Sequence, residues 1–159
     1  MQRFRLLVMV PALVVSAGVP VGAGSGQPPP TIPERARGAE RVVVATVANT
    51  TARYERNRFG DELIVTYAQL AVEEAIKGSQ GPAVLAIEGG TVNGMTMRVS
   101  DLPAMSTGER AVFFLTPRPD GSYTPHLRGQ GVLKIDRANR VQGSSLTVDE
   151  IRRLTRGRE

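Results

Sequence analysis

The sequence predicts a mainly β protein, a small single-domain β-barrel that ends in a short C-terminal α-helix. Short segments rich in β-branched and aromatic residues recur at intervals of about ten to twenty residues, with turn residues between them. A helix-start pattern follows near the C-terminus, after the last of these segments. The strand spacing alone also suits a β-sandwich, the other architecture built from many short strands.

Residues 1–23 have the layout of a secretory signal peptide. Arg3 and Arg5 form a positive start, an uncharged apolar stretch follows, and Val21 and Ala23 are the small residues that precede a cleavage site. An uncleaved membrane anchor is the alternative, because the stretch approaches the ~20 apolar residues that span a bilayer. The prolines within it weaken such a helix. We expect a cleaved signal and export to the periplasm or medium of a bacterium, with membrane contact only if the segment is retained.

Length, cysteine content and charge limit the number of domains and the kinds of partner that this chain can have. Residues 24–159 are enough for one domain with its own core. Cysteine is absent, so neither a disulfide nor a thiolate is available. Without Arg3 and Arg5, 18 basic and 15 acidic residues give a net charge of +3, and the two signs are interspersed. A nucleic-acid surface needs a concentrated basic face, so a nucleic-acid partner is not favoured.

After the signal the chain divides into three parts. Residues 24–39 form a Pro/Gly-rich linker with a short helical turn from Pro33, because proline is tolerated at the first helical position. Residues 40–145 form the β-barrel domain, and residues 146–159 form the C-terminal capping helix. Within the barrel domain we predict strands at residues 41–48, 62–76, 83–88, 95–99, 111–116, 123–126 and 131–135.

Residues 62–76 carry two competing patterns. Their apolar positions fall on one face of a helix that Gly78 would end, but they also alternate as one face of a strand from Ile64 to Val72. The start of the segment, LIVTY, strongly prefers extended structure. We predict one long strand that ends near Ile76.

The stretch EGGTVNGMTM, residues 88–97, raises the question of a phosphate-binding loop. Gly89 and Gly94 have the outer spacing of a P-loop, but Met95 stands where that motif needs lysine. Asn93-Gly94 is instead the strongest short hairpin signal, because both residues tolerate the positive φ of a type I′ turn. We predict a turn here and no phosphate site.

The C-terminal helix has a defined start. Thr147 is an N-cap, and Glu150 three residues later completes a capping box. Ile151 and Leu154 are three residues apart on one helix face, and both are expected to dock on the barrel. The arginines on the other faces are expected to lie in solvent.

The sequence predicts no assembled catalytic, metal or cofactor site. His126 is the only histidine and no cysteine accompanies it, so the usual zinc ligand sets are missing. Glu73 and Glu74 are adjacent and would face opposite sides of a strand. We therefore expect a non-enzymatic protein without a cofactor. A hydrolase whose two carboxylates meet only in the fold remains the enzymatic alternative.

Within residues 40–151, RVVVATV is followed by a long segment ending in AIKG, then by AIEGGTVNGMTMRVSDLP, GERAVFFL and RGQGVLKID. In this order the segments resemble a family of exported bacterial β-barrel proteins and the netrin-type barrels, which include the tissue inhibitors of metalloproteinases. The resemblance implies an OB-like (oligonucleotide/oligosaccharide-binding) barrel. Those inhibitors bind the catalytic zinc through an N-terminal cysteine. Because this chain has no cysteine, their mechanism does not carry over.

These observations favour an exported, non-enzymatic barrel that binds a protein partner in the envelope or outside the cell, with protease association as one version. Loops at residues 100–108 and 118–122 are expected to supply contact surface. The alternative is an oligosaccharide- or nucleic-acid-binding module centred on the arginine-rich loop ARYERNRFG, residues 52–60, where basic and aromatic residues interleave. The candidate contact residues are Tyr54, Arg56, Arg58 and Phe59.

Overall fold

The computed structural model describes residues 28–157, and the predicted signal peptide at residues 1–23 lies outside the described residues. Five strands form a closed ring: β1 (Arg41–Arg56), β2 (Glu62–Lys77), β3 (Ala83–Glu88), β6 (Arg110–Pro117) and β7 (Tyr123–Pro125). Their order is β1–β2–β3–β7–β6, and β6 pairs with β1 to close the ring. β3 and β7 run parallel, whereas the other pairs of the ring are antiparallel. This confirms the predicted mainly β, OB-like barrel.

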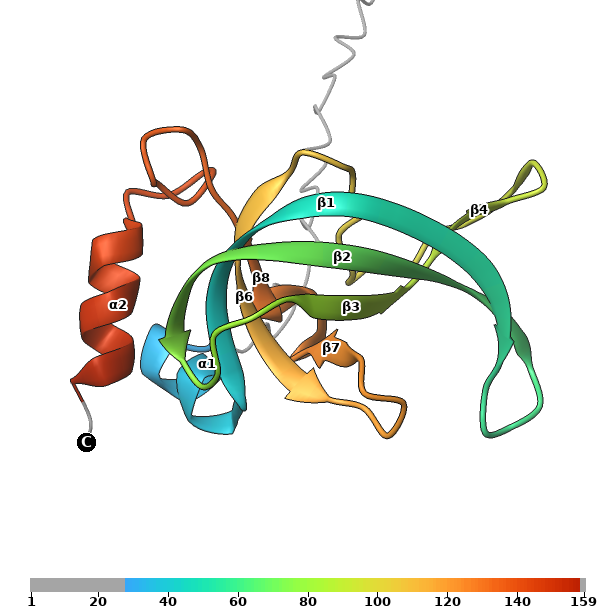
Figure 1. Ribbon diagram of the computed structural model, residues 1–159, viewed down its shortest axis with the longest axis horizontal. Helices are drawn as coiled ribbons and strands as arrows, with labels where there is room; N and C mark the ends of the chain where they lie inside the picture. The colour runs from blue at the N-terminus through green and yellow to red at the C-terminus, as the bar shows by residue number, and fades with distance from the viewer. Residues whose placement is uncertain (1–27, 158–159) are drawn as a thin grey trace, which may run out of the picture.

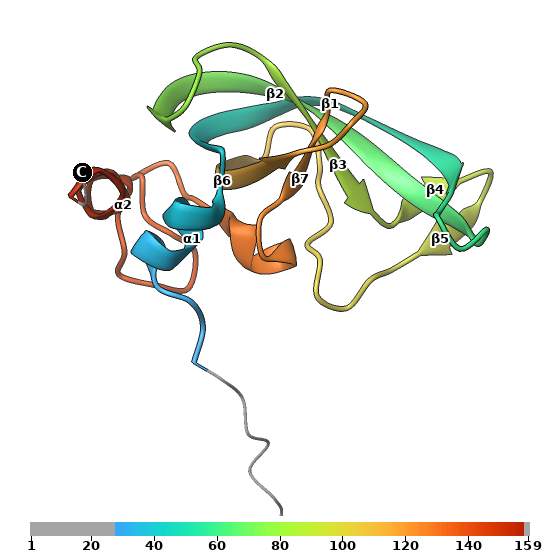
Figure 2. The same ribbon diagram turned by 90° about the horizontal axis from the view of Figure 1, so that it is seen from below.

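The remaining elements lie around the ring. The hairpin of β4 (Gly90–Val92) and β5 (Met95–Met97) follows β3, and the 3-10 helix η1 (Arg128–Gly131) leads into β8 (Val132–Lys134), which pairs with β6. Helices α1 (Ile32–Gly38) and α2 (Val148–Arg156) precede and follow the barrel. Figure 1 shows β1 and β2 curving across the molecule, from α2 at one end to the β1–β2 turn at the other, and Figure 2 shows α1 beside α2. Among residues 28–157, no helix has the length and apolar character that crossing a membrane requires.

The predicted strands form, and one of them is much longer than expected. β1 continues past residue 48 to Arg56, so the predicted arginine-rich loop is wrong for residues 52–56, and only residues 57–61 turn. Residues 52–56 are extended because they pair in unbroken register with the start of β2. Cross-strand pairing here overrides the weak strand preference of ARYER. β2 is one strand as far as Lys77, so the helical alternative for residues 62–76 is wrong.

Two apolar clusters, one on each face of β1 and β6, stabilise the barrel. Val43 and Phe113 belong to the cluster inside the ring, and Val44 and Phe114 belong to the cluster beneath α1 and α2. Adjacent residues serve different clusters because successive side chains on a strand point to opposite faces. This explains why residues 42–45 are buried without interruption.

α2 begins with the predicted capping box, in which the Glu150 N–H donates to Thr147 Oγ1 (3.3 Å) and the Thr147 N–H donates to Glu150 Oε2 (2.8 Å). Ile151 is fully buried in the outer cluster. Leu154 is 44% exposed, so the expectation that both residues dock on the barrel is wrong for Leu154. Arg152 attaches the helix to β2 instead, through two hydrogen bonds of 2.7 Å to the carboxylate of Glu74.

The glycine-rich stretch at residues 88–97 is a turn, as predicted. Asn93 and Gly94 have φ values of 50° and 79° and connect β4 to β5. Gly90 has a φ of 135°, and a methyl group there would lie 2.3 Å from Thr66 Oγ1 and 3.2 Å from Ala52 Cβ. Glycine therefore allows the hairpin to pack closely against one face of the β1–β2 ribbon.

Candidate functional site

A groove of about 360 Å³ lies on the outer surface of the barrel, beside the β1–β2 turn. β2 and β3 contribute its floor, and the turns after β1 and β6, together with η1, contribute its walls. In OB barrels the face of the second and third strands, with the loops that flank it, is the usual ligand surface. The residues lining the groove are Glu55, Arg56, Asn57, Arg58, Leu63, Val65, Ala86, Ile87, Glu88, Leu102, Arg118, Thr124 and Arg128.

The groove combines a basic rim with an apolar floor. Four arginines line it. Arg118 lies within 3.7 Å of Glu55 and Asp120, and Arg128 pairs with acidic side chains as well, so the positive charge of the rim rests on Arg56 and Arg58. Arg128 forms an ion pair with Asp101 and lies 3.6 Å from Glu88, which fixes the guanidinium at one wall. Leu63 and Val65 present apolar surface between these charges. Such a site suits a ligand that carries both acidic and apolar groups.

The turn at residues 57–61, called the tip turn below, is held by its own hydrogen bonds. Asn57 Oδ1 accepts from the N–H groups of Phe59 and Asp61, each at 2.9 Å. The Asn57 N–H donates to the Asp61 carbonyl (2.9 Å), and Gly60 takes a φ of 91° that glycine adopts without strain. The turn presents Phe59, which is 73% exposed, with the guanidinium of Arg58 lying 4.7 Å from the ring centroid.

Beside the groove, Glu55 and Tyr67 form a linked polar cluster on the same face of the β1–β2 ribbon. The Tyr67 hydroxyl donates to Glu55, and Arg53 Nη2 donates to Glu55 Oε1 (2.8 Å). The Tyr67 bond above all, with Arg53 in support, holds the pKa of the Glu55 carboxyl below its ordinary value. The guanidinium groups of Arg53 and Arg118 lie 4.2 and 5.9 Å from the centroid of the Tyr67 ring. Both the hydroxyl and the ring of Tyr67 are therefore engaged within the chain.

At the opposite wall, two consecutive non-glycine residues have left-handed backbone. Leu127 and Arg128 have φ values of 55° and 56°, a conformation that costs about 1–2 kcal/mol for each residue with a side chain. The Gly129 N–H donates to the Asp101 carbonyl (3.0 Å), and a methyl group at Gly129 would lie 2.1 Å from that oxygen. This close contact holds the segment in place and directs Arg128 into the groove. Strained backbone of this kind is enriched at functional sites.

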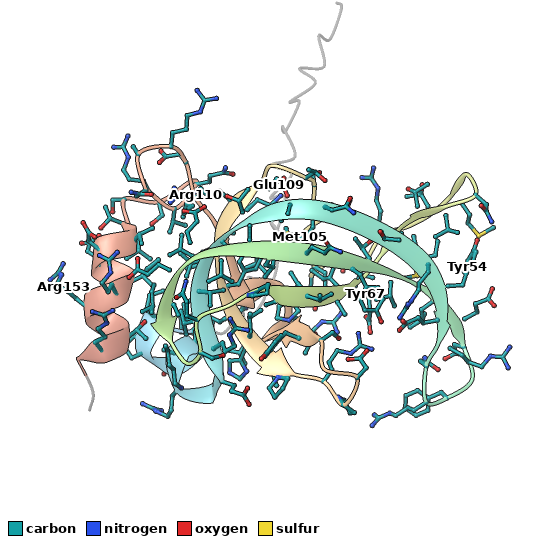
Figure 3. The ribbon with its side chains drawn as sticks, in the orientation of Figure 1. Tyr54, Tyr67, Met105, Glu109, Arg110 and Arg153 are labelled. Carbon is teal, nitrogen blue, oxygen red and sulfur yellow. The ribbon has the colours of Figure 1, made fainter. Side chains whose placement is uncertain are left out.

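The structure brings together three of the four predicted contact residues. Arg56 and Arg58 line the groove, and Phe59 projects from the tip turn next to it. Tyr54 is 38% exposed and pairs across the ribbon with Ile64, on the face that the β4–β5 hairpin covers. Figure 3 shows Tyr54 and Tyr67 well separated along the ribbon.

The sequence did not indicate that Glu55, Tyr67 and Arg128 belong to the site. Had the tip turn been recognised, pairing residue 57 with residue 61 would have placed Glu55 opposite Leu63 and on the same strand face as Arg53. Arg118 belongs to a turn that was predicted as contact surface, residues 118–122. Nothing in the local sequence indicates that Arg128 reaches the same groove.

The other polar residues considered from the sequence, Glu73, Glu74 and His126, contact neighbouring elements of the fold and do not line the groove. Glu73 and Glu74 face opposite sides, as predicted: Glu73 pairs with Arg110 (2.6 Å) and Glu74 with Arg152. His126 is half-buried, its Nδ1 lies 3.3 Å from Thr116 Oγ1, and burial, with a smaller contribution from Lys77, lowers its pKa. Among residues 28–157, no three histidine or acidic side chains gather as metal ligands.

Comparisons of this chain with protein-family models and with curated proteins find no match. The chemistry of the groove is therefore the indication of its function. That chemistry consists of an arginine rim, an apolar floor and one projecting aromatic side chain on a hydrogen-bonded turn.

Proposed function

We propose that this chain is an exported, non-enzymatic binding module that holds a protein partner in the groove beside the tip turn. The observation that carries the proposal is Phe59, a large apolar side chain left 73% exposed next to an arginine-rimmed groove. Aromatic and arginine side chains are enriched among the residues that dominate protein–protein affinity. The hydrogen bonds of Asn57 order the turn before binding, which lowers the entropy cost of association.

The chemistry of the groove defines the partner. Its arginines suit a segment with acidic side chains, and its apolar floor and Phe59 suit apolar side chains on the same segment. Export rests on the pattern of residues 1–23, and the partner is accordingly an envelope or extracellular protein. An extracellular protease is one version of that partner, suggested by the resemblance to netrin-type barrels.

Binding of an oligosaccharide or nucleic acid is the second candidate, and the position of the groove on the β2–β3 face favours it. Such ligands stack on exposed aromatic rings. Tyr67, on the groove side of β2, has its ring approached by Arg53 and Arg118 and its hydroxyl bonded to Glu55. Tyr67 is therefore engaged within the chain and offers no free face for stacking, and the apolar floor formed by Leu63 and Val65 suits a protein ligand better.

A hydrolase with two dispersed carboxylates is the third candidate. A general acid of this kind needs a raised pKa, whereas the pKa of Glu55 is lowered. Glu88 lies 3.6 Å from Arg128, an arrangement typical of an ion pair. These observations support a binding role for the groove.

Affinity enrichment from the host's extracytoplasmic fraction, with mass spectrometry as readout, tests the proposal. The wild-type protein is expected to retain one reproducible protein, and Phe59→Ser and Arg58→Ala are expected to lose it. Leu154→Ser and Arg153→Ala are the matched controls, because both residues are exposed on α2 at the far end of the molecule (Figure 3). Retention of the partner by both groove variants would contradict the proposal. Recovery of polysaccharide or nucleic acid alone would favour the second candidate, and added extracellular metalloproteases test the protease version.

A further inference from the structure

The outer edge of β1 is open over its second half. β1 pairs with β6 only from Arg41 to Thr46, and Val47 is bonded to the loop at Gly108 and Glu109. Beyond that point β2 lies on one side of β1, and within residues 28–157 no strand pairs with the other side. An open strand edge is a template for a further strand.

The hydrogen bonds of the tip turn identify which backbone groups face this edge. The Asn57 N–H donates to the Asp61 carbonyl, so residue 57 points its backbone groups toward β2. Because bonded and non-bonded pairs alternate along an antiparallel ladder, Arg53 and Glu55 also face β2, and Tyr54 faces outward. The carbonyl of Ile64, the partner of Tyr54, accepts from the Gly89 N–H on the far side of β2, as this alternation requires. Among the described residues, no hydrogen bond reaches the backbone N–H of Tyr54 from the open side.

The side chains along this edge are self-complementary: two copies of the edge placed antiparallel bring opposite charges together. We propose that a second copy of this chain pairs with it edge to edge, β1 against β1 in antiparallel fashion, on a two-fold axis through Tyr54. In that register the axis passes midway between the two Tyr54 residues, whose side chains lie opposite each other, and each Arg53 lies opposite Glu55 of the second copy. Opposite charges and aromatic pairs in directly facing positions stabilise antiparallel strands. An isologous contact of this kind closes as a dimer.

The intrachain arrangement prepares these charges for pairing. Arg53 and Glu55 lie on one face of β1, already joined at 2.8 Å, so the dimer would set four alternating charges around the axis. A centre moved by one residue, to Arg53, would place the two Arg53 side chains opposite each other, which is unfavourable. Tyr54 is 38% exposed and does not line the groove, and the proposed dimer contact would cover its side chain. This inference does not depend on the partner proposed for the groove.

Cysteine cross-linking tests the register, because the chain contains no cysteine of its own. At the axis, Tyr54→Cys would place two Cα atoms about 5.5 Å apart, within the range that a disulfide bridges. Thr50→Cys is the matched control on the same strand face, since its two copies would lie roughly 27 Å apart at about 3.4 Å per residue. The full chain, purified as the host leaves it, is oxidised mildly and analysed without reducing agent. A covalent dimer with Tyr54→Cys and none with Thr50→Cys is expected. Equal cross-linking of the two variants, or none of either, would overturn the proposal.

Charge reversal provides a second measurement that does not alter Tyr54. In sedimentation equilibrium the wild-type chain is expected to dimerise. Arg53→Glu alone and Glu55→Arg alone place like charges opposite each other and should abolish dimerisation. The double variant Arg53→Glu, Glu55→Arg restores complementary pairs and should recover it, with circular dichroism confirming that each variant is folded. A monomeric wild-type chain at every concentration, or failure of the folded double variant to recover the dimer, would refute the inference.

Discussion

Replacing Ile151 by alanine should destabilise the protein more than any comparable change on α2. Ile151 is fully buried in the outer cluster, where it packs among residues of β1, β6 and α1. The substitution removes three carbon atoms, worth about 2.4 kcal/mol at ~0.8 kcal/mol for each buried methylene. The cavity left behind adds to this loss, and buried isoleucine-to-alanine changes cost about 2–5 kcal/mol in total. We expect about 3–4 kcal/mol, a large share of the ~5–15 kcal/mol that stabilises a typical domain.

Urea unfolding followed by circular dichroism measures this effect. Leu154→Ala is the matched control, because Leu154 lies on the same helix but is 44% exposed. It should cost no more than about 1 kcal/mol, as expected for a residue outside the core. The slope of the free energy of unfolding against urea should stay unchanged in both variants. Equal losses for Ile151→Ala and Leu154→Ala would refute the reasoning that α2 is held by the outer cluster at Ile151.

Three further outcomes are expected. The hydrogen bonds from Arg152 of α2 lower the pKa of Glu74 below 4.5, so the stability that they contribute is complete above pH 4.5 and is lost as the pH falls through the lower, folded-state pKa. Acid should therefore lower the urea midpoint less in Glu74→Gln than in the wild-type protein. An identical fall in both proteins would contradict this. Gly90→Ala should lower the thermal midpoint more than Gly94→Ala. Both residues have positive φ, but of the two only Gly90 would place the added methyl group against another atom, 2.3 Å from a threonine oxygen of β2. Equal falls of the thermal midpoint would show that the close contact is unimportant. Asn57→Ala should speed hydrogen exchange at the Phe59 amide by removing its acceptor, with little change in global stability; unchanged exchange would mean that Asn57 does not order the tip turn.

Local sequence predicted the elements whose signals are chemically explicit. The strand at residues 83–88 follows from AVLAIE, and the hairpin at Asn93-Gly94 follows from the positive φ that both residues tolerate. The start of α2 follows from the capping box of Thr147 and Glu150. In each case a few neighbouring residues contain the whole physical reason, so no distant contact is needed.

The candidate site was only partly predictable. The sequence singled out Arg56, Arg58 and Phe59 because basic and aromatic residues interleave there, and the structure places all three at the groove or beside it. It also grouped Tyr54 with them, because a segment interpreted as a loop gives no alternation of faces. Once β1 is extended to Arg56, strand alternation puts Tyr54 on the face opposite Glu55.

The sequence by itself determined which segments extend, where the chain turns and where the last helix begins, since these depend on side-chain chemistry within a few residues. Only the tertiary structure decided that residues 52–56 are strand, because their pairing with β2 outweighs their own weak preference. It alone also decided the ring closure of β6 on β1 and the meeting of Arg118 and Arg128 with the tip turn. Those contacts join residues far apart in the chain, and the packing of the whole barrel, not any local pattern, selects them.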